Sequence, residues 1–111
     1  IEGLGEGPSY GLSKALANIL TLNMAKIYPK LKINACTPGF IETDMTRPMA
    51  KAWGKSPEEA GMKDPSFGAI APVFLLFDDS VGHGSYYGSD ALRSPIDKYR
   101  SPGTPAFSGK Y

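Results

Sequence analysis

Hydrophobic residues recur every three or four positions over residues 9–28, which is the spacing of one face of an α-helix. Pro29 ends this pattern, because a proline inside a helix removes a hydrogen bond and clashes with the preceding turn, whereas Pro8 suits the first turn. We therefore expect one helix from about residue 9 to 28, with an apolar face wide enough to be covered by a sheet and a neighbour. The members of that face are Leu12, Ala15, Leu16, Ile19, Leu20, Met24 and Ile27.

Two short segments have the pattern of β-strands. Residues 31–37 follow the helix after a tight turn and end at Pro38-Gly39, and residues 85–88 follow a glycine-rich turn. The order of helix, short turn and apolar strand is the second half of a βαβ crossover, which implies a parallel sheet. We expect these segments to pair in parallel, with Tyr86 and Tyr87 on opposite faces of the sheet.

The chain between the two strands is predicted to hold a mobile segment and two helices. Residues 40–57 form the mobile segment, and Ser56 at its end has the properties of a helix cap followed by acidic residues. Residues 67–77 form a second apolar helical run. Pro72 either kinks this run or lies in its first turn.

These elements divide the chain into two predicted parts. Residues 1–92 alternate helix and strand, but two strands cannot make a stable parallel sheet by themselves. We therefore expect an α/β fold in which this part is the C-terminal half of a doubly wound, Rossmann-type domain whose N-terminal nucleotide-binding half is absent. Residues 93–111 are rich in Pro, Gly and Ser and are predicted to form an extended tail.

Composition argues against several kinds of partner. The chain has 12 basic and 11 acidic residues and no basic cluster, so no nucleic acid is predicted. No apolar run approaches the ~20 residues that span a bilayer, so no membrane partner is predicted. The single Cys36 rules out an internal disulfide and agrees with a cytoplasmic location. The single His83 lies between glycines without partners at ligand spacing, so we interpret it as a surface loop residue and predict no metal site.

Tyr10 and Lys14 are the strongest candidates for chemistry. They lie four residues apart at the start of the predicted helix, which puts their Cβ atoms on one face about 6 Å apart. An ammonium favours the ionised form of a neighbouring phenol, so the pair suits general acid and base catalysis. The same spacing is common on solvated helix faces, and the pair alone leaves both interpretations open.

The residues that follow turn the pair into a longer motif. Tyr10-x-x-x-Lys14, then Thr37-Pro38-Gly39, then Ile41-x-Thr43 resemble, in order and spacing, the classical short-chain dehydrogenases/reductases. The resemblance covers roughly residues 5–92 and is strongest between residues 9 and 45. The tail from Tyr87-Gly88-Ser89-Asp90 onward looks like the carbonyl-reductase-type members.

The resemblance implies an oxidoreductase that transfers hydride between NADP(H) or NAD(H) and a small carbonyl or alcohol, with NADP slightly favoured. Tyr10 would be the acid/base. Lys14 would favour the ionised form of Tyr10 and hold the ribose hydroxyls of the nicotinamide. A nicotinamide supplies the hydride, so the protein need only position the reactants and balance the proton.

The resemblance also implies a cofactor loop after the first strand. Pro38 and Gly39 would shape the loop over the nicotinamide, with Gly39 allowing close backbone approach. The Ile41 backbone would meet the carboxamide, and the Thr43 hydroxyl would bond the amide or a phosphate.

Met45, Met49 and Trp53 lie four residues apart in the segment after this loop. If the segment is helical, they form one apolar ridge. Two interpretations remain open for the ridge: ordinary core packing, or a substrate lid of the kind that closes over an active site.

Several features of the family have no counterpart here. Gly3-x-Gly5-x-Gly7 has the wrong spacing for a phosphate loop and follows no strand, and the family's catalytic serine has no equivalent. We therefore expect an incomplete site, which leaves open whether the 111-residue chain alone is an enzyme. Two alternatives remain: an extended-type nucleotide-sugar epimerase or dehydratase, which Thr37-Pro38-Gly39 disfavours, and a non-catalytic remnant or scaffold of the same fold. The substrate and the oligomeric state cannot be predicted.

Overall fold

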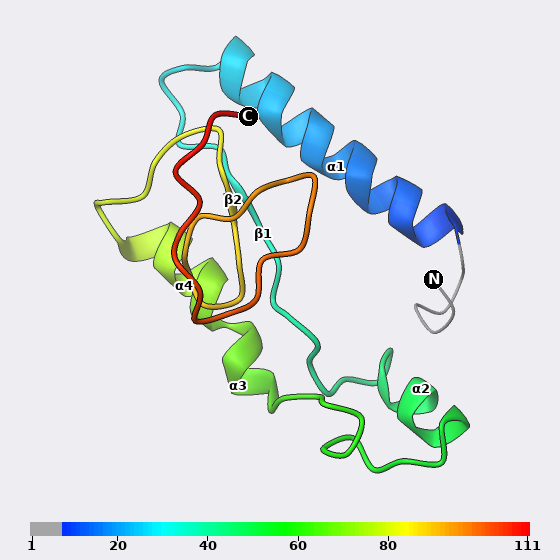
Figure 1. The fold of residues 1–111 in the computed structure, drawn as a ribbon. Coiled ribbons are helices and arrows are strands. Elements are labelled where there is room, and N and C mark those ends of the chain that lie inside the picture. Colours follow the sequence, from blue (N-terminus) through cyan, green and yellow to red (C-terminus); the bar gives the residue numbers. More distant parts are fainter. Residues whose placement is uncertain (1–7) are drawn as a thin grey trace.

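The computed structural model describes residues 8–111, so the glycines at positions 3, 5 and 7 lie outside the described residues. Figure 1 shows the long helix α1 along one side of the two central strands, α4 on the other side, and α2 set apart from both. The elements in chain order are α1 (Pro8–Ile27), β1 (Ala35–Cys36), α2 (Arg47–Ala52), α3 (Pro65–Gly68), α4 (Ile70–Phe77) and β2 (Tyr86–Tyr87).

Helix α1 confirms the prediction from hydrophobic spacing and from the two prolines. It begins at Pro8, and its last turn closes where the Tyr28 N–H donates to the Met24 carbonyl at 2.9 Å. Its apolar stripe, however, is largely uncovered, since Leu12 and Leu20 are each 61% exposed. Ala25, at the end of the helix next to Gly84, is buried.

The two strands pair in parallel, as predicted, with Ala35 opposite Tyr86 and Cys36 opposite Tyr87. The ladder begins where the Gly84 N–H donates to the Ile33 carbonyl at 2.9 Å. Strand β1 is shorter than the predicted 31–37, because the Leu31 N–H bonds the Tyr28 carbonyl in a turn instead. As expected, the two tyrosines differ: Tyr87 is buried against Phe74 of α4, and Tyr86 is half-buried.

His83 is an exposed loop residue, as predicted, and it also makes contacts with two other parts of the fold. Its Nδ1 accepts the Ile33 N–H at 3.4 Å, and its Nε2 lies 2.8 Å from the Ala25 carbonyl oxygen. The ring therefore joins the end of α1 to the start of the strand ladder, although it remains exposed. These contacts could not be predicted from the sequence, because a single histidine between glycines belongs to no periodic pattern.

The segment predicted to be mobile contains helix α2. It follows a turn in which the Thr43 carbonyl accepts the N–H groups of Thr46 and Arg47 at 3.1 and 2.9 Å. Pro48 lies in its first turn, where a missing N–H costs nothing. The helix ends near Gly54, which has a positive φ of 66°.

The cap predicted at Ser56 is present, but no helix follows it. The Glu59 N–H donates to the Ser56 hydroxyl at 3.2 Å, and the Ser56 N–H donates to the Glu59 carboxylate at 2.9 Å. This reciprocal pair is a capping box. The chain makes turns instead of a helix and leaves them at Gly61, where φ is 82°.

The predicted apolar run at 67–77 is divided into two helices. Asp64 caps α3 by accepting the Ser66 N–H, and the break falls at Ala69. Pro72 lies in the first turn of α4, which decides between the two alternatives that the sequence left open.

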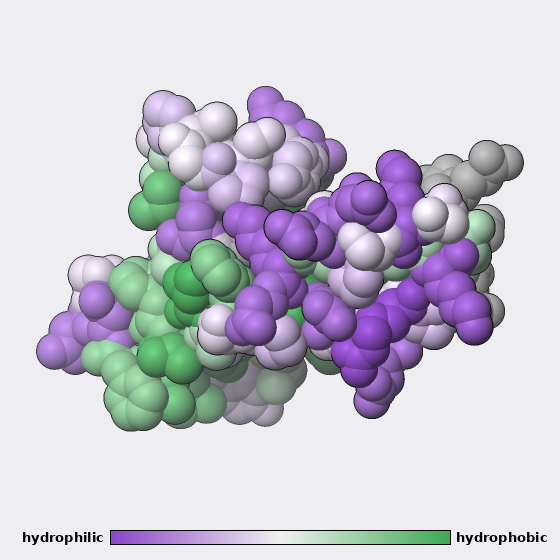
Figure 2. All heavy atoms as spheres, turned by 90° about the horizontal axis from the view of Figure 1, so that it is seen from below, coloured by the Kyte–Doolittle hydropathy of each residue, from purple (hydrophilic) through white to green (hydrophobic). Residues whose placement is uncertain are grey.

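The described residues bury little apolar surface. No large side chain among them is fully buried, and the radius of gyration is 15.1 Å, against about 13 Å for a compact chain of this length. Apolar side chains gather at the left of Figure 2, the side on which Figure 1 places α3 and α4. On α4, Leu76 and Phe77 are 74% and 76% exposed. The buried hydrophobic residues are Ala25, Ile41, Ala50, Met62, Ala71, Val81 and Tyr87.

Residues 93–111 contain no helix or strand, but they are fastened to β2. The Ser94 N–H donates to the Tyr86 carbonyl at 2.8 Å, and the Tyr111 hydroxyl accepts the Tyr86 N–H at 3.0 Å. The Arg93 guanidinium lies 4.8 Å from the centre of the Tyr111 ring and 5.5 Å from that of Phe107. None of the described helices has the length and apolar character needed to span a membrane.

Candidate active site

Tyr10 and Lys14 lie side by side near the start of α1. The Lys14 Nζ is 5.5 Å from the centre of the Tyr10 ring, within the range of a cation–π contact. Tyr10 is half-buried and Lys14 is exposed. The helix therefore presents a phenol and an ammonium together, open to a ligand.

A pocket of about 710 Å³ lies at the carboxyl ends of the two strands. Thr37 and Gly39, which follow β1, and Gly88 and Ser89, which follow β2, line it. Ligands of open parallel sheets bind in the crevice outside the carboxyl ends of the strands. The position of the pocket is therefore that of a ligand site in this class of fold.

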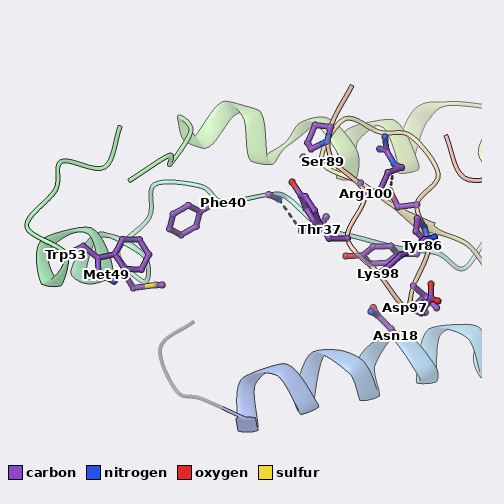
Figure 3. Close-up of a pocket in the computed structure, with 17 residues that line it drawn as sticks. Asn18, Thr37, Phe40, Met49, Trp53, Tyr86, Ser89, Asp97, Lys98 and Arg100 are labelled. Carbon is purple, nitrogen blue, oxygen red and sulfur yellow. Dashed lines mark hydrogen bonds between the residues drawn. The ribbon is translucent and has the colours of Figure 1, made fainter. Parts of the chain in front are cut away.

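Asn18 connects this pocket to the Tyr10 and Lys14 pair. The three residues form a row at four-residue intervals along one face of α1, and Asn18 lines the pocket. Figure 3 shows Asn18 projecting from α1 toward the residues of the tail. Tyr10 and Lys14 do not line the pocket themselves, and Tyr10 lies about 12 Å further along the helix axis. The four-residue spacing from Lys14 is the signal in the sequence that points to Asn18.

The loop after β1 has the conformation that its glycine predicts. Gly39 has a φ of 89°, and a Cβ at this position would lie 3.1 Å from the Ser89 Cβ. The Gly39 N–H donates to the Thr37 hydroxyl at 3.3 Å, a bond drawn in Figure 3. Pro38 and Gly39 also line a second cavity of about 160 Å³. Only glycine tolerates this backbone and this approach without strain.

Ile41 and Thr43 lie just beyond the pocket wall. Ile41 is buried, and its N–H donates no backbone hydrogen bond within residues 8–111. The Thr43 hydroxyl lies 3.1 Å from the Thr46 hydroxyl in the turn before α2. Neither residue lines the main pocket, whereas Gly39 does.

The ridge expected from Met45, Met49 and Trp53 is only partly formed. Met49 and Trp53 line the pocket beside Phe40, whose ring centre is 6.3 Å from that of Trp53. Met45 is 69% exposed and does not line the pocket, because α2 begins two residues after it. Figure 3 places Met49 of α2, and Trp53 directly after that helix, at the end of the pocket far from Asn18.

Sequence reasoning missed an ion pair that holds the tail beside the pocket. Arg100 pairs with Asp90, and their side chains are only 7% and 20% exposed. The Arg100 Nε also donates to the Ser94 hydroxyl at 2.8 Å, and the Gly103 N–H donates to the second Asp90 oxygen at 2.9 Å. The two charges lie ten positions apart in a Pro/Gly-rich stretch, where no periodicity signals a contact.

The environment lowers the pKa of the Asp90 carboxyl. Burial by itself would raise the pKa, but hydrogen bonds from Arg100 and from the N–H groups of Gly103 and Leu92, together with the Arg100 charge, outweigh it. These donors all favour the ionised carboxylate. Asp90 therefore stabilises the attachment of the tail in its charged form.

We expect acid to weaken the fold through Asp90. Because the folded-state pKa lies below the unfolded value of about 3.9, the stabilisation is present above that value and is lost as pH falls through the folded-state pKa. Urea unfolding at a series of acidic pH values should show a smaller acid-induced loss of free energy in Asp90→Asn than in the wild type. Asp79→Asn, a change at an exposed carboxyl away from the tail, is the control. Equal losses in all three proteins would contradict the role of Asp90.

Two other groups can be placed in the described part of the chain. Cys36 is half-buried at the end of β1, and burial raises the pKa of its thiol, which disfavours the reactive thiolate. Within residues 8–111 no three His, Cys, Asp or Glu side chains are grouped so that they could hold a metal ion.

The chain is 37% identical over 87 residues to carbonyl reductase [NADPH] 1 of Mus musculus, an alignment that covers 70% of this chain and 27% of that protein. The Homo sapiens protein of the same name is 36% identical over 87 residues, with the same coverage. The Rattus norvegicus protein is 37% identical over 70 residues, covering 58% of this chain and 24% of that protein. The chain thus spans about a quarter of the length of these relatives. No protein-family model and no solved structure matches it.

Proposed function

Since this chain carries a carbonyl-reductase-like sequence of the short-chain dehydrogenases/reductases, as its motifs predicted, we propose that it supplies the acid/base and the nicotinamide loop of an NADPH-dependent reductase of small carbonyl compounds. The observation that carries this proposal is the row of Tyr10, Lys14 and Asn18 on one face of α1. That face leads from the acid/base pair to the pocket at the strand ends. The names of the relatives support the cofactor and the substrate class.

Tyr10 is proposed as the group that balances the proton. When hydride from the bound cofactor reaches the carbonyl carbon, the Tyr10 hydroxyl donates its proton to the carbonyl oxygen and leaves a phenolate. In the reverse direction the phenolate removes the proton from the alcohol. The Lys14 ammonium, 5.5 Å from the centre of the ring, stabilises the phenolate by its charge.

The residues after β1 fit the nicotinamide end of such a cofactor. Gly39 lines the pocket, and the N–H of the buried Ile41 donates no backbone hydrogen bond within residues 8–111. We propose that Ile41 donates to the carboxamide and that the Thr43 hydroxyl bonds the amide or a phosphate. Pro38 would fix the entry of the loop, and Lys14 would hold the ribose hydroxyls.

We further propose that residues 1–92 act as the C-terminal part of a Rossmann-type domain. The parallel pairing of β1 and β2 and the uncovered faces of α1 and α4 support this role. In that arrangement the pyrophosphate would be bound by a glycine-rich turn at another helix start, which residues 8–111 do not contain. The nucleotide-sugar alternative lacks support, since the relatives found are carbonyl reductases.

A hybrid protein tests the proposal. Its first part is mouse carbonyl reductase [NADPH] 1 up to the residue before the aligned segment. Its second part is this chain, from its first aligned residue to its last residue. We expect the hybrid to reduce a simple ketone with NADPH, whereas calorimetric titration of the 111-residue chain alone with NADPH or NADH should show no tight binding. A folded hybrid without activity would favour the non-catalytic scaffold instead. Micromolar binding by the 111-residue chain would show that it holds the dinucleotide without a glycine-rich turn.

A further inference from the structure

The tail supplies most of one wall of the main pocket. Every residue from 95 to 102 except Ser101 lines that pocket, and we call this segment the tail loop. It lies between α1, from which Asn18 projects, and the ends of β1 and β2 (Figure 3). A segment that the sequence predicts to be an extended tail thus becomes part of the candidate site.

The tail loop is held by specific contacts at both ends. Pro95 and Ser94 are buried, and the Ser94 N–H bonds β2 at 2.8 Å. At the other end Arg100 pairs with Asp90 and donates to the Thr104 carbonyl at 2.7 Å. Because these anchors flank residues 96–99, they hold the backbone of this stretch beside the pocket.

Tyr99 stands out among these side chains. It is 82% exposed, more than any other large hydrophobic residue of the described chain. It has no hydrogen bond and no ring contact with the rest of residues 8–111, yet it borders three cavities of the described chain. An aromatic ring placed this way gains packing contacts only when something enters the pocket beside it.

The remaining walls favour an uncharged, flat ligand. Phe40, Met49, Trp53 and Tyr86 give the pocket a largely aromatic and apolar surface. On the tail loop, the charges of Asp97 and Lys98 are opposite and adjacent, and Arg100 is neutralised by Asp90. The loop therefore offers no net charge to bind an acid or a base.

We propose that the tail loop is a specificity element of the pocket, in which Tyr99 contacts an uncharged aromatic substituent of the carbonyl substrate. This inference rests on the proposed function, since it identifies which part of the substrate the pocket would recognise. The reacting carbonyl would lie toward Tyr10 on α1, and the substituent would lie between Tyr99 and the aromatic side chains of the opposite wall. Arg100 is a positioning residue that keeps the loop in place.

The single tryptophan is a built-in probe of this inference. Trp53 is the only tryptophan of the chain and lines the pocket. Titration of the 111-residue chain with acetophenone should quench its fluorescence in a saturable way, whereas acetone, which lacks the aromatic substituent, should quench only in proportion to its concentration. We expect Tyr99→Ala to weaken acetophenone binding by about threefold to tenfold, the effect of one aromatic contact.

Matched variants separate recognition from general damage. Tyr28→Ala removes the same side chain from an exposed site that does not line the pocket, and it should bind acetophenone like the wild type. Tyr99→Phe keeps the ring and should also bind normally. Equal affinities for wild type and Tyr99→Ala, or quenching by acetophenone that never saturates, would overturn the proposal.

The same measurement separates this inference from the proposed function. The quenching requires neither NADPH nor hydride transfer. If the 111-residue chain binds acetophenone saturably but the folded hybrid is inactive, the proposed reductase function is refuted and the proposed binding pocket stands. If the hybrid is active but its Tyr99→Ala variant has an unchanged KM for acetophenone, the proposed role of Tyr99 is refuted and the proposed reductase function stands. In an active hybrid, a raised KM with unchanged kcat is the expected result, because the contact is equally strong in the ground and transition states.

Discussion

Replacing Tyr10 by Phe in the hybrid reductase is expected to lower kcat at least 10²–10⁴-fold, the range that general acid and base assistance commonly contributes. The change removes one hydroxyl and keeps the ring beside the Lys14 ammonium, so the helix should fold as before. The KM for NADPH should change little, because the proposed task of the hydroxyl is proton transfer. Tyr28→Phe makes the same chemical change at the other end of α1 and should leave kcat unaltered.

Lys14→Ala in the same hybrid distinguishes the two members of the pair. Lys14 is proposed both to stabilise the phenolate and to hold the ribose, so its loss should raise the KM for NADPH as well as lower kcat. Steady-state kinetics of both variants measure this difference. Near-native turnover in Tyr10→Phe would return the pair to the ordinary surface contact that the sequence also allowed.

The helix and the strand pairing could be predicted because their signals are local and repeated. In α1 the apolar period runs for five turns between two prolines, and each residue adds to the same conclusion. The parallel pairing of β1 and β2 could be predicted because the order of helix, short turn and apolar strand is that of a βαβ unit. The Tyr10 and Lys14 pair is predictable for the same reason, since a helix fixes its geometry.

Other parts of the structure depend on contacts between distant residues, which no local pattern reveals. The capping box at Ser56 predicts the start of a helix, but the chain turns away at Gly61, which has a positive φ, before a helix forms. Met45 satisfies the four-residue spacing of a ridge, yet the chain before α2 is not helical. The pocket wall made by the tail depends on Asp90 and Arg100 meeting across ten residues of irregular chain.

A methyl group at Gly88 should disrupt this wall, because it would enter the contacts that anchor the tail loop. A Cβ at this position would lie 2.7 Å from an Arg100 guanidinium nitrogen, 2.9 Å from an Asp90 carboxylate oxygen and 2.9 Å from the Ser94 hydroxyl. All three atoms belong to the contacts that anchor the tail loop, and none can move without weakening a hydrogen bond. We expect Gly88→Ala to lower the free energy of unfolding in urea by about 1–3 kcal/mol, the usual cost of overpacking.

The same change at Gly82 provides the control, since a Cβ there would meet the Tyr87 hydroxyl at an ordinary 3.5 Å. Gly82→Ala should therefore cost much less than Gly88→Ala. If the clash with the guanidinium is the cause, Arg100→Ala should relieve part of it, so the double variant Gly88→Ala/Arg100→Ala should lose less stability than the sum of the two single variants. Gly88→Ala should also weaken acetophenone binding, because the displaced tail loop moves Tyr99 out of the pocket. Additive losses with unchanged binding would mean that Gly88 acts on the strand end alone and that the tail loop is positioned by its other anchors.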